Sequence, residues 1–273
     1  MPNLRIVNLG SSSQGNCTYY EYGDDRILVD VGLSARQIEY RLREIGSDIR
    51  SITHALITHE HNDHIQGVKV LSKRFDGIKF FSNYETFNHF SYVGNIQMFR
   101  SGFPFVFGEN KIICKSIRVP HTAAEPVGFR LWFDETSVTH LTDLGYVDDA
   151  TVEDIACSEV VLIESNYDPK MLEQSDRPFD TDRRNFGRTG HLSNNECATA
   201  LCKAKHLNVD DSWRPAVGLL HLSRSFNTPG LALAELERVA GLKAVVTTEL
   251  SPTVVFPFKP SVCASDFVGT IGE

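Results

Sequence analysis

The sequence lacks a membrane-spanning or secretory segment. None of its 273 residues falls within an apolar run long enough to cross a bilayer. The N-terminus, Met-Pro-Asn-Leu-Arg-Ile, has no basic stretch followed by an apolar one, which is the pattern of a signal peptide. We therefore expect a cytoplasmic protein that does not contact a membrane.

Paired cysteines and an excess of positive charge are also missing. The six cysteines include no Cys-X-X-Cys pair, and the chain is far longer than the small secreted domains that disulfides stabilise, so we expect reduced thiols. Asp and Glu (35) outnumber Lys and Arg (27), and the net charge of −8 excludes a general binding surface for polyanions. Any contact with nucleic acid must therefore be local.

The chain does contain alternating strand-like and helix-like segments. Hydrophobic residues make up 41% of it, enough for a large core. Short β-branched and apolar runs predict strands at residues 4–10, 26–32, 52–58, 79–82, 111–119, 127–133, 137–142, 160–165, 216–222 and 243–249. Helical spacing of apolar residues predicts helices at 34–45, 65–75, 195–205 and 231–239. The fold class is therefore α/β, and residues 168–190 are expected to form a long surface loop.

The densest group of ionisable residues is Thr58-His59-Glu60-His61-Asn62-Asp63-His64, between a predicted strand and a helix predicted to begin near Ile65. Imidazole together with carboxylate suits Zn, Mn or Fe. Placing so many ionisable groups beside an apolar strand is costly unless a cation compensates their charge. The segment therefore predicts a metal site. Isolated histidines are usually packed or solvated, and this is the expectation for His54, His89, His140 and His206.

Three later motifs complete a resemblance to a known family. His121 follows Pro120, Asp143 follows Thr142 and His221 follows Leu220, in that order along the chain. With the first segment, they resemble the signature of the metallo-β-lactamase superfamily of hydrolases. Five further segments, residues 10–17, 121–126, 164–168, 190–194 and 221–227, resemble its YycJ/WalJ-like branch, whose members are regarded as DNA exonucleases acting from the 5′ end and as relatives of ribonuclease Z.

This resemblance implies a four-layer αββα sandwich of two facing mixed sheets flanked by helices. It implies a single domain, residues 1–273, with two quasi-equivalent halves of about 1–135 and 136–273. It also implies two divalent metal ions, Zn, Mn or Fe. One ion would be held by His59, His61 and His121, the other by Asp63, His64 and His221, and Asp143 would bridge them.

The same ligand set implies phosphodiester hydrolysis. Two neighbouring cations lower the pKa of a bridging water and neutralise the charge on a phosphoryl group under attack, so a shared hydroxide would be the nucleophile. Asp63 is therefore predicted to be catalytic as well as a ligand. His191, oriented by Glu164, is predicted to be the general acid, because a ribonuclease Z-like relative would use a histidine at this point. Ser193 and Asn194 are predicted either to contact the substrate or to cap the following helix, with Glu196 in its first turn.

Two further groups of residues are predicted to contact phosphate. Hydroxyl and N–H groups of the turn after the first strand could bind a terminal phosphate, although such residues more often only form a turn. Guanidinium groups could hold the next phosphate or form an electropositive lip that steers a nucleic-acid end, although charge runs are often only solvated. The turn residues are Ser11, Ser12, Ser13 and Asn16; Arg224 is assigned to the next phosphate, and Arg183 and Arg184 to the lip.

The function expected from these residues is metal-dependent hydrolysis of nucleic acid, most simply by a 5′-to-3′ DNA exonuclease. A small-molecule cyclic phosphodiesterase or a ribonuclease Z-like hydrolase on the same fold remains an alternative. A non-enzymatic, metal-stabilised binding protein is the third possibility, and the complete ligand set argues against it. Residue chemistry alone leaves the native metal and the choice between DNA and RNA open.

Overall fold

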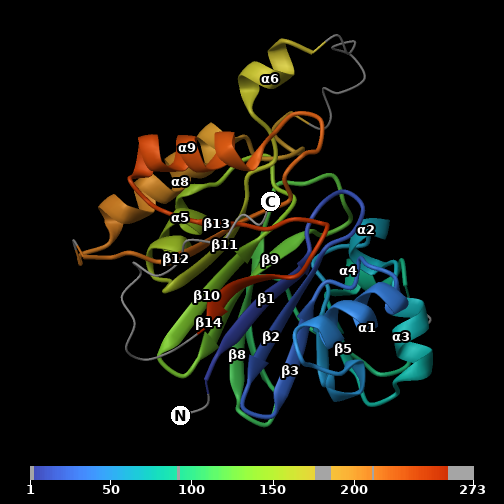
Figure 1. The fold of residues 1–273 in the computed structure, drawn as a ribbon. Coiled ribbons are helices and arrows are strands. Elements are labelled where there is room, and N and C mark those ends of the chain that lie inside the picture. Colours follow the sequence, from blue (N-terminus) through green and yellow to red (C-terminus); the bar gives the residue numbers. More distant parts are fainter. Residues whose placement is uncertain (1–2, 91–92, 176–185, 211, 258–273) are drawn as a thin grey trace.

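The apolar runs of the sequence form strands, and the strands build two facing sheets with helices on their outer faces (Figure 1). The computed structural model describes residues 3–90, 93–175, 186–210 and 212–257. These four layers confirm the predicted αββα architecture.

The first sheet has the strand order β14-β1-β2-β3-β4-β5-β6. Neighbouring strands are antiparallel from β14 to β3 and parallel from β3 to β6. The strands are β1 (Arg5–Gly10), β2 (Cys17–Tyr22), β3 (Asp25–Val29), β4 (His54–Leu56), β5 (Lys79–Ser82), β6 (Ile96–Met98) and β14 (Thr253–Pro257).

The second sheet, in the order β13-β12-β11-β10-β9-β8-β7, has the same mixed arrangement. Its strands are antiparallel from β7 to β10 and parallel from β10 to β13. They are β7 (Pro104–Phe107), β8 (Ile112–Arg118), β9 (Val127–Phe133), β10 (Thr136–Leu141), β11 (Val160–Glu164), β12 (Ala216–Leu220) and β13 (Val245–Val246). The chain passes between the sheets after β6 and returns with β14. The equivalence of the two halves stays a prediction.

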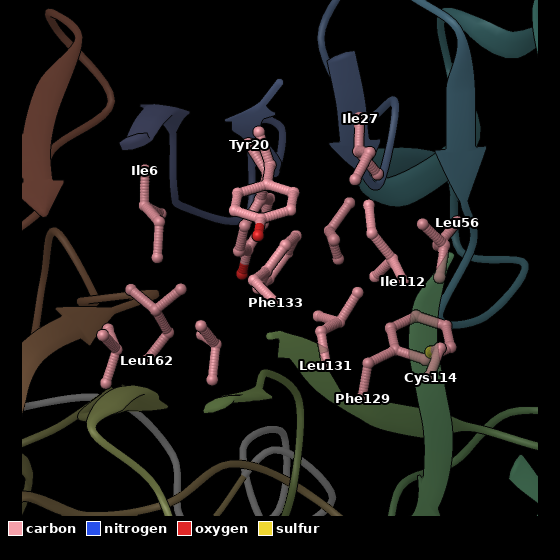
Figure 2. Close-up of a cluster of buried hydrophobic side chains, with 14 of the residues drawn as sticks. Ile6, Tyr20, Ile27, Leu56, Ile112, Cys114, Phe129, Leu131, Phe133 and Leu162 are labelled. Carbon is pink, nitrogen blue, oxygen red and sulfur yellow. The ribbon is translucent and has the colours of Figure 1, made fainter. Parts of the chain in front are cut away.

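The main core lies between the two sheets. Figure 2 shows Tyr20 and Ile27 of the first sheet pointing toward Phe129, Leu131 and Phe133 of the second. Tyr20, Ile27, Phe129 and Leu131 are fully buried, and Phe133 nearly so. Burying a side chain of this size contributes about 1.5–3 kcal/mol, so this layer holds the sheets at a fixed separation.

Helices cover the outer face of each sheet. Helices α1 (Ala35–Glu44) and α3 (Val68–Arg74) pack on the first sheet, and α5 (Asp149–Ala156), α8 (Asn194–Leu207) and α9 (Pro229–Ala240) pack on the second (Figure 1). The short elements are η1 (Ile49–Ser51), α2 (Asn62–Ile65), α4 (Tyr84–Phe87) and α6 (Pro169–Glu173). Among the described residues, no helix has the length and apolarity to span a membrane.

The predicted helix at 65–75 is wrong in its start and its continuity. Helix α2 begins at Asn62, and Gly67 separates it from α3. A Cβ atom on Gly67 would lie 2.4 Å from the carbonyl oxygen of Leu33. The close contact between Gly67 and the backbone of Leu33 therefore requires a glycine at this position. Asp63 and His64 therefore lie within a helical turn rather than in a loop.

Other differences follow from burial and from short elements. Strand β2 was not predicted because nearly all of its residues are buried, which removes the alternation of apolar and polar residues. Strands β6, β7 and β14 were also missed, and only Val245–Val246 of the predicted strand at 243–249 is a strand.

The expected loop at 168–190 contains α6. Residues 176–185 lie outside the described residues. Of the six cysteines, the five that are described are free thiols, as expected.

A buried Tyr–His pair joins the two sheets through the core. The Tyr20 hydroxyl lies 2.7 Å from Nδ1 of His140, and the two side chains are 0% and 2% exposed. Burial lowers the pKa of His140 from 6.5 to about 3, which favours a neutral ring in the hydrogen bond with Tyr20. The structure therefore places His140 in the core between the sheets, and its structural role stays a prediction.

The His140 pKa predicts a specific dependence of stability on pH. Below pH 6.5 the unfolded chain protonates this ring and the folded chain does not, so stability is lost as the pH falls toward 3. In His140→Gln, whose amide oxygen can still accept from Tyr20, the free energy of unfolding should fall less between pH 6.5 and pH 4, by roughly 3 kcal/mol. Urea unfolding of metal-free protein measures this difference. Equal slopes for H140Q and wild type would contradict the assignment.

Candidate metal centre

The predicted ligands meet at one edge of the sandwich, just beyond the ends of strands from both sheets. His59 follows β4, His121 follows β8, Asp143 follows β10 and His221 follows β12. Asp143 and His221 adopt φ angles of 55° and 56°, in the left-handed region that non-glycine residues seldom occupy. Such conformations cost about 1–3 kcal/mol each and persist where surrounding contacts hold them. The backbone therefore turns sharply to place these two side chains.

His59, His61 and His121 form the first group of donors. Nδ1 of His61 lies 3.0 Å from Nε2 of His59 and 3.2 Å from Nε2 of His121. In a tetrahedral site with metal–nitrogen bonds of about 2.0–2.1 Å, the ligating nitrogens lie about 3.3 Å apart. Nδ1 of His121 faces the carbonyl oxygen of Gly190 at 3.2 Å, which leaves its Nε2 free to bind a metal. The three nitrogens fit one divalent ion.

Asp63, His64, Asp143 and His221 form the second group. Nε2 of His64 lies 2.9 Å from Oδ2 of Asp143 and 3.4 Å from Oδ2 of Asp63. Nε2 of His221 lies 3.8 Å from the same Asp63 oxygen. The ligand atoms of Asp143 also fall within 4.8 Å of those of His59 and His64. Asp143 therefore lies between the two groups, where a bridging carboxylate is expected.

Two buried atoms of this group have no hydrogen-bond partner. They are Nε2 of His221 and Oδ2 of Asp143, and the second lies 2.9 Å from Nε2 of His64 without forming a hydrogen bond. Buried polar atoms are almost always paired, so these two atoms favour a bound cation in this group. The donor set, imidazole nitrogens with carboxylate oxygens, suits Zn, Mn or Fe. The residues present thus fit divalent metal ions.

Electrostatics also favour bound positive charge. Burial would raise the pKa of Asp63, but the neighbouring imidazoles of His221 and His64 hold it below its usual range. Burial would lower the pKa of His64, yet the carboxylates of Asp30 and Asp143 raise it well above its usual value. Burial would also lower the pKa of His221, but nearby carboxylates, Asp143 foremost, raise it well above its usual value. Metal ions and protons compete for the imidazole nitrogens of His64 and His221. The carboxylates that stabilise a proton on these nitrogens would also stabilise a metal cation bound to them.

Glu164, at the end of β11, connects two of the histidines. Its Oε1 lies 2.8 Å from Nδ1 of His191 and 2.7 Å from Nδ1 of His221, and its side chain is fully buried. Its Oε2 accepts hydrogen bonds from the N–H groups of Leu144, at 3.0 Å, and Leu192, at 3.3 Å. Burial would lower the pKa of His191, but Glu164 and Asp143 raise it. The structure thus brings together the predicted pair of His191 and Glu164.

Ser193 and Asn194 make contacts within the protein. Ser193 is the N-cap of α8, and its hydroxyl and Glu196 form the capping box that the sequence suggested. The Oδ1 of Asn194 accepts from the hydroxyl of Ser165 at 2.6 Å, and its amide donates to Asn227 at 2.9 Å. The capping alternative is confirmed for Ser193, and a contact of either side chain with substrate stays a prediction.

The predicted phosphate contacts are distributed unevenly. Ser11 and Asn16 are buried beside the metal ligands, Ser12 is buried, and Ser13 is exposed. Arg224 is exposed and forms an ion pair with Glu249. Arg183 and Arg184 lie outside the described residues, so their role stays a prediction.

Several residues that hold the ligands were not predicted from the sequence. Asp30 has a φ of 62°, and its Oδ2 faces Nδ1 of His64 at 2.7 Å. It also accepts from the N–H and hydroxyl of Thr58, at 2.9 and 3.0 Å. Glu60 accepts from the N–H of Ala124 at 2.8 Å and so links the first and second ligand loops. An acidic residue at the end of a predicted strand was the available signal for Asp30.

Comparison with known proteins identifies the family. The model of the beta-lactamase superfamily domain matches residues 25–208. Exodeoxyribonuclease YycJ of Bacillus anthracis is 31% identical over 242 residues, which cover 86% of this chain and 89% of the relative. Exodeoxyribonuclease WalJ of Streptococcus pneumoniae strain D39 is 33% identical over 232 residues, covering 82% and 83%.

A solved structure supports the fold independently. The metallo-beta-lactamase fold protein YhfI of Bacillus subtilis superimposes with a TM-score of 0.70 at 13% identity, over 92% of this chain and 99% of that one. The superfamily signature in the sequence, the αββα sandwich and the histidine and aspartate cluster therefore agree with one another. The chain belongs to the metallo-β-lactamase superfamily, in the branch of the YycJ and WalJ proteins, and is a metal-dependent hydrolase.

Proposed function

We propose that this protein hydrolyses DNA from the 5′ end and does so with two divalent metal ions. The observation that carries the proposal is the position of Asp143, whose carboxylate lies between two separate groups of donors. The names of the YycJ and WalJ relatives, both exodeoxyribonucleases, support DNA as the substrate.

The protein's own residues would divide the work as follows. His59, His61 and His121 would hold one ion, Asp63, His64 and His221 would hold the other, and Asp143 would be shared between them. When bound, such ions acidify a water and neutralise the negative charge that develops on a phosphoryl group. The protein supplies rigid ligands and, because most of them are buried, a site of low dielectric constant in which these charges act strongly.

His191 is placed to supply the proton for the leaving oxygen. Its ring centroid lies 5.0 Å from that of His221 and 5.6 Å from that of His121, so it borders both groups of donors. Because Glu164 engages its Nδ1, the Nε2 nitrogen remains for proton transfer. The side chain is 19% exposed, which leaves it in reach of a substrate.

End-labelled DNA tests the proposed polarity. With Mn²⁺ or Zn²⁺, a label on the 5′-terminal phosphate should appear as a mononucleotide from the earliest time points, while a 3′ label should remain in progressively shorter strands. Covalently closed circular DNA should stay intact. Release of the 3′ label first, or nicking of the circle, would overturn the polarity. Cleavage of a small phosphodiester or of RNA, with no action on DNA, would favour the corresponding alternative hydrolase.

Removal of the shared carboxylate should affect both ions. Asp143→Ala is expected to lower the metal content after dialysis to less than half of the wild-type value. Turnover should fall by more than about 100-fold, because even residues behind the ligands change activity by about 10–100-fold. Elemental analysis and DNA turnover measure the two effects. Asp149→Ala, whose side chain is 95% exposed, is the matched control and should change neither. Full metal content in D143A would contradict a shared ligand.

The role of His191 can be separated from metal binding by the choice of leaving group. A general acid contributes about 10²–10⁴-fold to turnover when the leaving oxygen needs a proton. His191→Ala should therefore slow DNA hydrolysis by that factor and keep its metal content. A nitrophenyl phosphodiester, whose leaving group departs as an anion, should lose less than about tenfold. Equal losses on both substrates would exclude proton donation by His191.

A further inference from the structure

The turn between β1 and β2 faces the metal ligands rather than open solvent. Ser11 and Asn16 are 3% and 4% exposed, whereas the side chains of Ser13 and Gln14, between them, are exposed. The sequence suggested a terminal phosphate as the partner of this turn. In the structure, the two buried side chains already have partners within the protein.

The amide of Asn16 contacts two ligands of the second group. Its Nδ2 donates to Oδ2 of Asp63 at 3.2 Å and lies 3.0 Å from Nε2 of His64. The same two atoms, Oδ2 of Asp63 and Nε2 of His64, lie 3.4 Å apart. The amide therefore fixes the direction of the Asp63 carboxylate beside the nitrogen that would bind metal.

The backbone of Asn16 is fixed as well. Its N–H donates to the carbonyl oxygen of Asp63, and its own carbonyl accepts from the N–H of Gly32, each at 2.8 Å. A Cβ atom on Gly32 would lie only 1.6 Å from the carbonyl oxygen of Asp63, so only glycine permits this approach. These two bonds hold the backbone of Asn16 beside that of Asp63.

Ser11 extends the same contact to the second sheet. Its hydroxyl accepts from the N–H of His221 at 2.8 Å and donates to Oδ1 of Asn16 at 3.3 Å. A continuous chain of hydrogen bonds thus runs from His221, after β12, through Ser11 and Asn16 to Asp63, beside β4. It connects ligands that the two sheets supply separately.

We propose that Asn16, held by Ser11, is a positioning residue of the metal centre that sets the affinity for the ion held by Asp63, His64 and His221. Hydrogen-bond partners behind metal ligands typically change metal affinity by 10–100-fold. Phosphate binding by Asn16 would require its amide to leave the Asp63 carboxylate. The inference rests on the proposed two-ion centre and adds a residue that controls one of its ions.

Metal binding to Asn16→Ala tests this inference without a catalytic readout. Wild-type protein loaded with Mn²⁺ should hold two ions, and competition with a chelator should give two dissociation constants. In Asn16→Ala, one of the two constants should rise about 10–100-fold and the other should stay within about threefold. The electron paramagnetic resonance signal of a coupled Mn²⁺ pair should give way to that of a single ion at limiting metal. Ser11→Ala, which keeps the amide and removes its tether, should show a smaller shift in the same direction.

Two controls separate this role from general structure and from substrate binding. Gln14→Ala, on the same turn with an exposed side chain, should bind both ions as the wild type does. At saturating Mn²⁺, the KM of Asn16→Ala for DNA should stay within about twofold of the wild-type value. Unchanged metal affinity in N16A, or a raised KM with full metal content, would overturn the inference and leave the two-ion proposal intact. A single ion in the wild type would overturn both.

Discussion

Buried charge at the junction of the two sheets is the constraint on which the metal centre depends. Asp143 and Glu164 are 2% and 0% exposed and lie among several imidazoles. An ionised group in such surroundings is costly unless it is paired with the opposite charge. Protons on His64 and His221, whose pKa values are raised, balance part of this charge. Divalent cations on the same nitrogens would balance it more completely, so the folded chain favours metal binding before any substrate arrives.

The second feature of the centre is that hydrogen-bond partners orient its histidines through their Nδ1 atoms. His64 faces Asp30, His121 faces the carbonyl of Gly190, and His221 faces Glu164. Each contact occupies Nδ1 and turns Nε2 toward the other members of the cluster, which fixes the ring orientation. The left-handed conformations at Asp30, Asp143 and His221 show that the fold accepts local strain to achieve this. Ligands that are already ordered need little reorganisation when an ion binds.

The sequence indicated the candidate ligands more clearly than the residues that contact them. His59, Asp143 and His221 belong to short motifs at strand ends, and the structure brings them together as the family pattern implied. Asp30 belongs to no such motif, and the motif that contains Asn16, residues 10–17, indicated a phosphate contact instead. Their roles depend on contacts across 34 and 47 positions of the chain, to His64 and Asp63, which local periodicity does not encode.

The fold shows the same limit. Strand β9, whose burial partly alternates, was predicted with its exact ends. Strand β2 was missed because its two faces are both covered, and the helix at 65–75 was drawn as continuous across Gly67. In both places a neighbour distant in sequence decides the outcome: the outer helices in the first case and the carbonyl of Leu33 in the second. The partner of Arg224 could not be predicted from local sequence either. It is Glu249, which lies in a loop within a segment that was predicted to be a strand.

Because the ligands come from both sheets, metal binding and sheet packing act on each other. Direct hydrogen bonds cross the junction from Val127 to Thr58, at 3.1 Å, and from His221 to Ser11, at 2.8 Å. A cation held by His59 and His121, or by Asp63 and His221, would add bonds across the same junction. It can bind in this way only when the sheets are docked, so its binding free energy adds to the stability of the folded state. The apolar core sets the separation of the sheets and the polar contacts at the edge set their register. A change in either would therefore reach the metal centre as a change in the distances between its ligands.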